Sequence, residues 1–112
     1  METSYRDRAA RDPFSAMTWD EIFDTVREYK KAWWRFPSRR SWKTFPIHQK
    51  AFARLRSTGI NYDMEVKLSD LGVWCFRQRE AKRGRGGYTI TDDQIHKLNS
   101  IRFNWDPSDD IF

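Results

Sequence analysis

The chain has 112 residues, with 21 Lys and Arg against 16 Asp and Glu, which gives a net charge of +5 and an isoelectric point near 9.6. This length makes one small domain. Aromatic residues form 16% of the sequence and supply a core, so the composition excludes a generally disordered chain. A mean hydropathy of -0.91, with no apolar run near the ~20 residues that cross a bilayer, excludes a transmembrane segment.

The single cysteine, Cys75, excludes an internal disulfide and every zinc site built on paired cysteines. It favours a reducing compartment. The first residues mix both charges and have no apolar stretch behind them, so we expect neither a signal peptide nor a membrane anchor. The sequence therefore predicts an intracellular protein of the cytoplasm or nucleus, with no membrane partner.

The two ends of the chain read as irregular. Residues 1–16 alternate Arg and Asp without an apolar period and end near Pro13, so they predict a flexible N-terminal arm. Residues 107–112 predict a solvated C-terminal tail. The domain between them spans residues 17–106.

The first helix has a marked start. Thr18 and Glu21 have the spacing of a capping box, and Met17 and Ile22 have that of a hydrophobic staple. From there to about Trp33 the apolar residues recur at intervals of three and four and predict one buried face: Trp19, Ile22, Phe23, Val26, Tyr29 and Trp33.

A basic connection and a second helix follow. Pro37 disfavours the helical region for the residue before it, so residues 36–43 should be looped or extended. Pro46 suits the first position of the second helix, because its missing N–H costs nothing there. Gly59 can take the left-handed conformation that ends this helix.

Two more helices are predicted. The third should start near Ser69 or Asp70 and end at about Arg83, before a glycine-rich loop. The fourth repeats the start of the first, because Thr91 and Gln94 form a second capping box.

Residues 55–63 and 98–106 resemble each other, and both end in an apolar residue, Asn, an aromatic residue and Asp. This echo predicts two helix-turn-helix units, each closed by an aromatic residue that folds back on its last helix; chance or convergent capping is the alternative. No strand pattern competes. The predicted fold class is all-α, a small bundle of three to four short helices.

A family resemblance extends the prediction. The motifs are Leu71-Gly72-Val73-Trp74, Gln78-Arg79, the basic loop at 82–84, the helix start at 91–98, and Phe103-Asn104-Trp105-Asp106. This set resembles the helicase-associated domain, a helical module found beside helicase cores and in arrays. The resemblance implies packed short helices and nucleic-acid binding, with DNA preferred over RNA by analogy.

Two features depart from the family pattern. Arg102 stands where the family usually has glycine, and residues 40–68 are longer than the family's connector. No phosphate-cradling loop ending in Gly-Lys-Ser or Gly-Lys-Thr is present, so the chain would be an accessory module without a motor.

Candidates for catalysis are few. His48 lies early in the second helix and His96 points away from the apolar face of the fourth, so both are expected in solvent. Cys75 falls on the buried side of the third helix, where a thiol acts as a small hydrophobe. We therefore expect no enzyme, no metal site and no cofactor.

Basic residues form two clusters. The third helix and its loop carry five cations, and the connection after the first helix carries a second group. Successive cations can follow a phosphate backbone, although a solvated helix face is the alternative. The second cluster consists of Arg35, Arg39, Arg40 and Lys43. The predicted nucleic-acid contacts are Arg77, Arg79, Lys82, Arg83 and Arg85, with Arg39, Arg40 and Lys43.

Three aromatic residues have no obvious packing position in the predicted bundle: Phe76, Trp34 and Trp42. Phe76 is either core or an exposed stacking or partner contact. Trp34 and Trp42 stand among basic residues, as in single-strand binders, but would also suit a lid over the bundle. The rival to nucleic-acid binding is therefore a protein-interaction module anchored by these aromatic residues.

Overall fold

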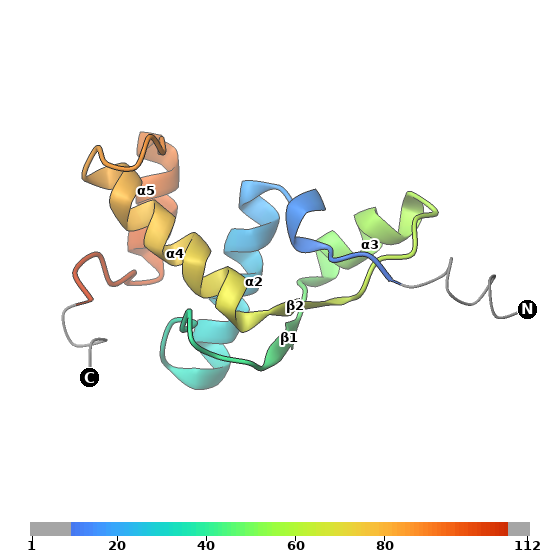
Figure 1. The fold of residues 1–112 in the computed structure, drawn as a ribbon. Helices are drawn as coiled ribbons and strands as arrows, with labels where there is room; N and C mark the ends of the chain where they lie inside the picture. Colours follow the sequence, from blue (N-terminus) through green and yellow to red (C-terminus); the bar gives the residue numbers. More distant parts are fainter. Residues whose placement is uncertain (1–9, 108–112) are drawn as a thin grey trace, which may run out of the picture.

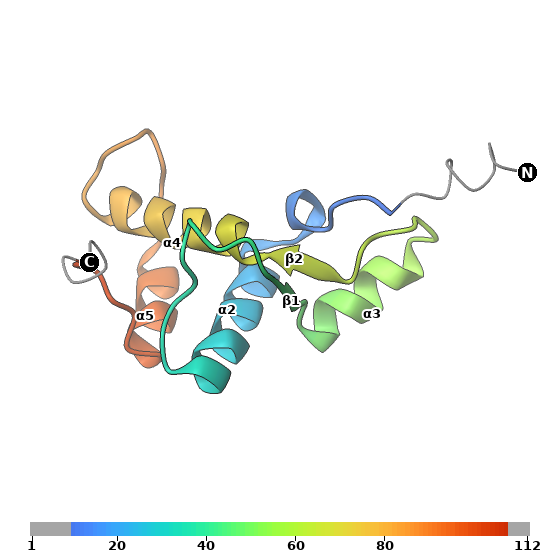
Figure 2. The ribbon, with the colours of Figure 1, turned by 60° about the horizontal axis from the view of Figure 1, so that its bottom comes forward.

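The computed structural model describes residues 10–107. Its elements are a short 3-10 helix η1 (Phe14–Ala16), four α-helices and two strands: α2 (Trp19–Trp33), β1 (Thr44–Pro46), α3 (Gln49–Ser57), β2 (Glu65–Lys67), α4 (Leu68–Lys82) and α5 (Asp92–Ser100). Helices α2, α4 and α5 gather at one side, and α3 lies on the other side of the strand pair (Figures 1 and 2). The predicted helical fold class is confirmed.

Both predicted capping boxes are present. The Thr18 hydroxyl accepts from the Glu21 N–H at 3.2 Å, and the Thr18 N–H donates to the Glu21 carboxylate at 2.9 Å. Thr91 and Gln94 make the same reciprocal pair at the start of α5. These bonds satisfy amide groups that a helix start leaves without partners, so α2 and α5 begin where the sequence places them.

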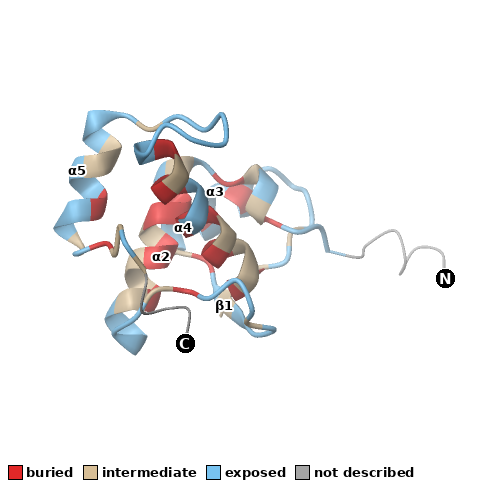
Figure 3. Cartoon of the chain, turned by 60° about the vertical axis from the view of Figure 1, so that its left-hand side comes forward, coloured by how far each residue is buried: buried red, intermediate tan, exposed pale blue. Residues whose placement is uncertain are grey.

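The core lies mainly between α2 and α4 (Figure 3). The Trp19 indole N–H donates to the Gln78 side-chain oxygen at 2.9 Å, and the rings of Trp19 and Trp74 lie 5.3 Å apart. Cys75 is buried on the inner face of α4, as predicted. Trp33, expected on the buried face, is 57% exposed instead; it is the last residue of α2, and the helix ends at Trp34 directly after it.

The strand pair was not predicted. Strands β1 and β2 pair antiparallel, with Phe45 opposite Val66, and each has three residues. Three residues are too few for an alternating pattern to appear in a sequence. Val66 is fully buried, and the strand pair lies between the three-helix side of the fold and α3 (Figures 1 and 2).

The predicted start of the second helix was wrong. Pro46 ends β1, and α3 starts at Gln49 with His48 as its N-cap. The His48 ring nitrogen Nδ1 accepts from the Lys50 N–H at 3.2 Å. Proline lacks a donor, which suits the edge of a short strand as well as the first turn of a helix, so it did not distinguish the two.

Part of the predicted arm is packed. Within the described residues, Pro13 is buried, and the backbone of Arg11 bonds to residues 61 and 63 at 2.9 and 2.8 Å. Residues 10–16 of the predicted arm therefore pair with the turn after α3. Residues 1–9 and 108–112, the rest of the predicted arm and tail, lie outside the described residues.

One ion pair joins the start of α2 to α3. The Arg54 guanidinium makes two hydrogen bonds to the Glu21 carboxylate, at 2.6 and 2.8 Å, and donates to the Ala16 carbonyl oxygen at 2.6 Å. The hydrogen bond from Arg54, helped by the backbone bond from Thr18, lowers the pKa of Glu21 below its ordinary value.

The echo has a structural counterpart. Gly59 and Arg102 occupy equivalent positions, and both have a left-handed backbone, with φ of 77° and 57°. After the second of these turns, the Trp105 indole N–H donates to the Asn99 side chain at 2.8 Å and so folds back onto α5 as predicted. In residues 10–107, no helix is long and apolar enough to span a membrane.

Candidate nucleic-acid interface

A basic groove lies between α4, the loop of residues 34–43 that joins α2 to β1, and residues 104–107. We call it the basic groove, and its volume is about 1130 Å³. In Figure 2 the loop leaves the end of α2 and runs up to α4 before it enters β1. One carboxylate, Asp106, lines the groove together with six cationic side chains: Lys30, Arg35, Arg39, Arg40, Arg79 and Arg83.

Close packing holds the loop against α4. A β-carbon on Gly72 would lie 2.5 Å from the backbone nitrogen of Arg39 and 2.6 Å from the carbonyl carbon of Ser38. The loop can approach this closely only because residue 72 lacks a side chain. Just before Ser38 in the chain, Pro37 is buried, and the ring of Phe36 lies 5.1 Å from that of Phe103.

The loop supplies three exposed cations of the groove. Arg35, Arg39 and Arg40 are all exposed. The Arg39 guanidinium lies 4.5 Å from the centre of the Phe76 ring, which orients it without neutralising its charge. The two predicted basic clusters thus meet at the groove through part of their members.

The cations that α4 contributes to the groove are also used within the fold. Arg79 is 8% exposed, and its Nε donates to the Asn104 carbonyl oxygen at 2.6 Å. Arg83 donates to the Trp105 carbonyl oxygen at 3.0 Å and lies 3.9 Å from the Asp106 carboxylate. Arg79 and Arg83 therefore hold the chain after α5 against α4, and the hydrogen bonds leave Arg79 little freedom to meet a ligand.

Four other predicted contacts do not line the groove. Arg85 pairs with Glu80 at 3.0 Å, and the remaining three are exposed and lie over aromatic rings. Their ring distances are 5.6 Å for Arg77 over Tyr88, 4.8 Å for Lys82 over Trp105 and 5.9 Å for Lys43 over Trp42. Lys43, Arg77, Lys82 and Arg85 lie outside the groove and are at most peripheral to it.

Two of the three aromatic candidates are almost fully exposed. Trp34 lines the groove and is 85% exposed, and Trp42 is 86% exposed. Phe76 is 36% exposed and lies beneath Arg39, which places it between the two alternatives left open by the sequence. Trp34 also has a left-handed backbone, with φ of 60°, as the C-cap of α2.

Sequence reasoning missed Lys30 as a groove residue. It lies in the last turn of α2, and its Nζ is 5.3 Å from the centre of the Phe36 ring. Lys30 and Lys31 both lie in this turn and only Lys30 lines the groove, so the sequence did not show which of the two faces the loop.

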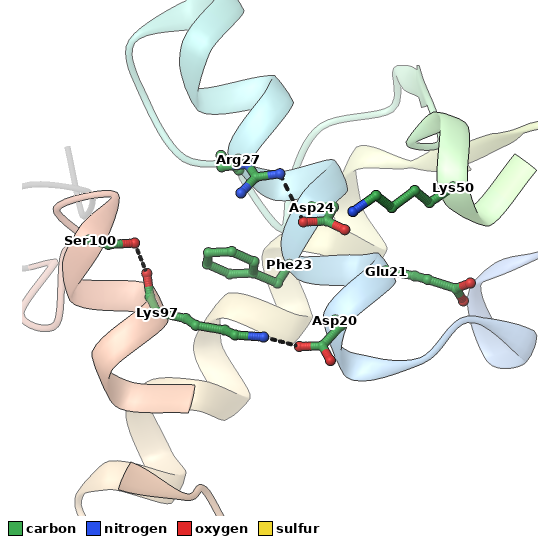
Figure 4. A pocket seen from close by; sticks show the side chains of 8 residues that line it. All are labelled: Asp20, Glu21, Phe23, Asp24, Arg27, Lys50, Lys97 and Ser100. Atoms are coloured by element: carbon green, nitrogen blue, oxygen red, sulfur yellow. Dashed lines mark hydrogen bonds and ion pairs between the residues drawn. The ribbon is translucent and has the colours of Figure 1, made fainter. Parts of the chain in front are cut away.

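A smaller pocket of about 420 Å³ lies between α2 and α5, with Lys50 of α3 at its edge (Figure 4). Its carboxylates are paired: Asp20 with Lys97 at 2.8 Å, Asp24 with Arg27 at 2.9 Å, and Glu21 with Arg54. Within residues 10–107, no group of three or more His, Cys, Asp and Glu side chains could hold a metal ion. This pocket is therefore an ion-pair seam between helices.

The two histidines serve no shared site. His48 caps α3. It was expected in solvent, but its side chain is only 16% exposed. His96 is exposed, as predicted.

The fold and groove define a small, mostly helical module with one basic, aromatic-rimmed face. A family model, the helicase-associated domain, matches residues 16–106, and the chain belongs to this family. The resemblance stated from the motifs is thus confirmed. No curated protein and no solved structure matches the chain.

Proposed function

We propose that this domain is a non-catalytic nucleic-acid-binding module that holds the phosphate backbone in the basic groove. The observation that carries the proposal is the composition of the groove, six cationic side chains against one carboxylate. A nucleic-acid backbone presents one negative charge per nucleotide and is the polyanion that such a surface complements. DNA is preferred over RNA by analogy with the family.

Two groups of groove residues would have different roles in binding. Arg35, Arg39 and Arg40 are exposed along one wall and are placed to neutralise phosphates. Arg79 and Arg83 build the opposite wall through their bonds to residues 104 and 105. Contacts of this kind position a backbone and carry no base code, so binding should be weakly sequence-specific.

Fluorescence anisotropy of labelled oligonucleotides, titrated at several salt concentrations, tests the proposal. The affinity should fall linearly in the logarithm of salt concentration. Arg40→Glu should weaken binding and reduce the salt slope by about 1, the value for one lost phosphate contact. Arg56→Glu is the matched control, because Arg56 is exposed on α3 and does not line the groove.

The competing function is the protein-interaction module, favoured by the exposure of Trp34 and Trp42. It predicts no binding of any oligonucleotide even at low salt, which would overturn the nucleic-acid proposal.

The proposed location is a reducing compartment, the cytoplasm or the nucleus, because the single cysteine is free and buried.

A further inference from the structure

The proposed function leaves the form of the nucleic acid open. Resting on that function, we propose that the basic groove takes single-stranded DNA, with one base stacked on the indole of Trp34. Three features carry this: the cations on two walls of the groove, the exposed tryptophan at its edge, and a second tryptophan-cation pair outside the groove at the far end of the loop.

The first feature concerns α4, the helix that carries many of the cations. Its N-terminal half is covered where the loop meets Gly72, and its C-terminal half is flanked by residues 103–106 through Arg79 and Arg83. Reading the base sequence of duplex DNA requires a protruding element that enters the major groove, so this side of α4 is not built for sequence-specific recognition of a duplex. The groove-facing side of α4 does not protrude, whereas a groove with cations on both walls can follow one flexible strand.

The second feature is Trp34. Its backbone N–H donates to the Lys30 carbonyl oxygen at 2.8 Å and ends α2, while 85% of the residue surface faces solvent. This position, with its positive φ, is one that glycine fills more readily than any bulky residue. The indole thus adds little to the core. It stands directly before Arg35, so a base could stack on the ring while the guanidinium meets the adjoining phosphate.

The third feature is a repetition of this arrangement. Trp42, at the other end of the loop, is 86% exposed, and the Nζ of Lys43 lies 5.9 Å from the centre of its ring. Proteins that bind single strands without a strict sequence combine a basic channel with aromatic faces on which successive bases stack. The two tryptophans bracket the loop whose arginines line the groove, so one strand following the loop would meet a ring at each end.

The test compares labelled oligo(dT) with a blunt duplex of the same phosphate count at one low salt concentration. Oligo(dT) should bind more tightly. Trp34→Ala should weaken oligo(dT) binding about tenfold, within the range measured for loss of one base stack, and leave duplex binding unchanged. Trp34→Phe should restore part of the loss, because phenylalanine keeps an aromatic face.

Trp33→Ala is the matched control, because Trp33 is the adjacent exposed tryptophan and does not line the groove. It should leave oligo(dT) binding unchanged, and thermal melting checks that each variant is folded. Tighter binding of the duplex, or no effect of Trp34→Ala on oligo(dT), would overturn this inference. Tighter binding of oligo(U) would overturn the choice of DNA.

These measurements also distinguish a failure of the single-strand inference from a failure of the proposed function. If Arg40→Glu weakens both oligo(dT) and duplex while Trp34→Ala changes neither, the groove binds phosphates and only the single-strand inference fails. If no oligonucleotide binds, the proposed function fails with it.

Discussion

Gly72 on α4 lies directly against the backbone of Arg39, which a β-carbon at residue 72 would approach to 2.5 Å. Backbone cannot yield as a flexible side chain can. Gly72→Ala should therefore lower the free energy of unfolding by about 1–3 kcal/mol, the usual cost of overpacking. The same change in an open helix position raises stability by about 1 kcal/mol, so the sign is diagnostic. Urea denaturation measures it, and a stabilised variant would show that the loop is not held there.

Trp34→Gly separates stability from binding. Glycine takes the left-handed conformation of residue 34, with φ of 60°, without steric cost, so the variant should gain about 1 kcal/mol in the free energy of unfolding. It also loses the indole, so binding of oligo(dT) should weaken. Trp34→Ala is the control for stability, because it keeps the β-carbon and the strain. A destabilised Trp34→Gly would mean that the indole packs on the fold.

Arg102→Gly tests the family departure by itself. Arg102 has φ of 57° at the position where the echo has Gly59 and the family usually has glycine. Removing its β-carbon should raise the free energy of unfolding by about 1 kcal/mol. Because Arg102 does not line the groove, affinity for oligonucleotides should stay the same. Chemical denaturation and anisotropy together check both expectations, and an unchanged midpoint would argue against strain at this turn.

Glu21→Gln should remove a pH-dependent part of the stability. The pKa of Glu21 is lowered from its ordinary 4.5, chiefly by the hydrogen bond from Arg54, so the ionised form favours the folded state. This contribution is fully present above pH 4.5 and is lost as the pH falls through the lowered value. Glutamine can keep the capping box, as Gln94 does in α5, but it removes the charge and one acceptor oxygen, so one of the two hydrogen bonds from Arg54 is lost as well.

The measurement is thermal melting of wild type and Glu21→Gln from pH 7 downward. The variant should melt at a lower temperature at pH 7, and the difference should shrink below pH 4.5. A difference that stays constant with pH would show that the charge on Glu21 is not what stabilises this contact.

Features that depend on residues close together in the chain were predictable from the sequence. The capping boxes at Thr18 and Thr91 depend on side chains three residues apart, so their spacing is visible without a structure. The left-handed turn at Gly59 was predicted for the same reason. By contrast, the pairing of Phe45 with Val66 depends on chain segments far apart in sequence, and no local pattern marks either strand.

The candidate site divides in the same way. The basic clusters were visible as composition, and the groove contains four of the eight cations proposed as contacts: Arg39, Arg40, Arg79 and Arg83. The sequence could not predict which of these cations make hydrogen bonds within the fold. The bond from Arg79 to Asn104 exists only because residues 103–106 return to α4, a tertiary event with no local signature.

The groove wall formed by residues 34–43 is tied down along its length before any ligand arrives. Its start bonds to α2 through Trp34, its middle rests on Gly72, and its end is held where the Leu68 N–H donates to the Lys43 carbonyl oxygen at 2.9 Å. A binding wall ordered in advance loses little conformational entropy on association, so more of its electrostatic attraction appears as affinity. On the proposed function, Gly72 and the strand pair would therefore favour binding by preorganising this wall of the groove.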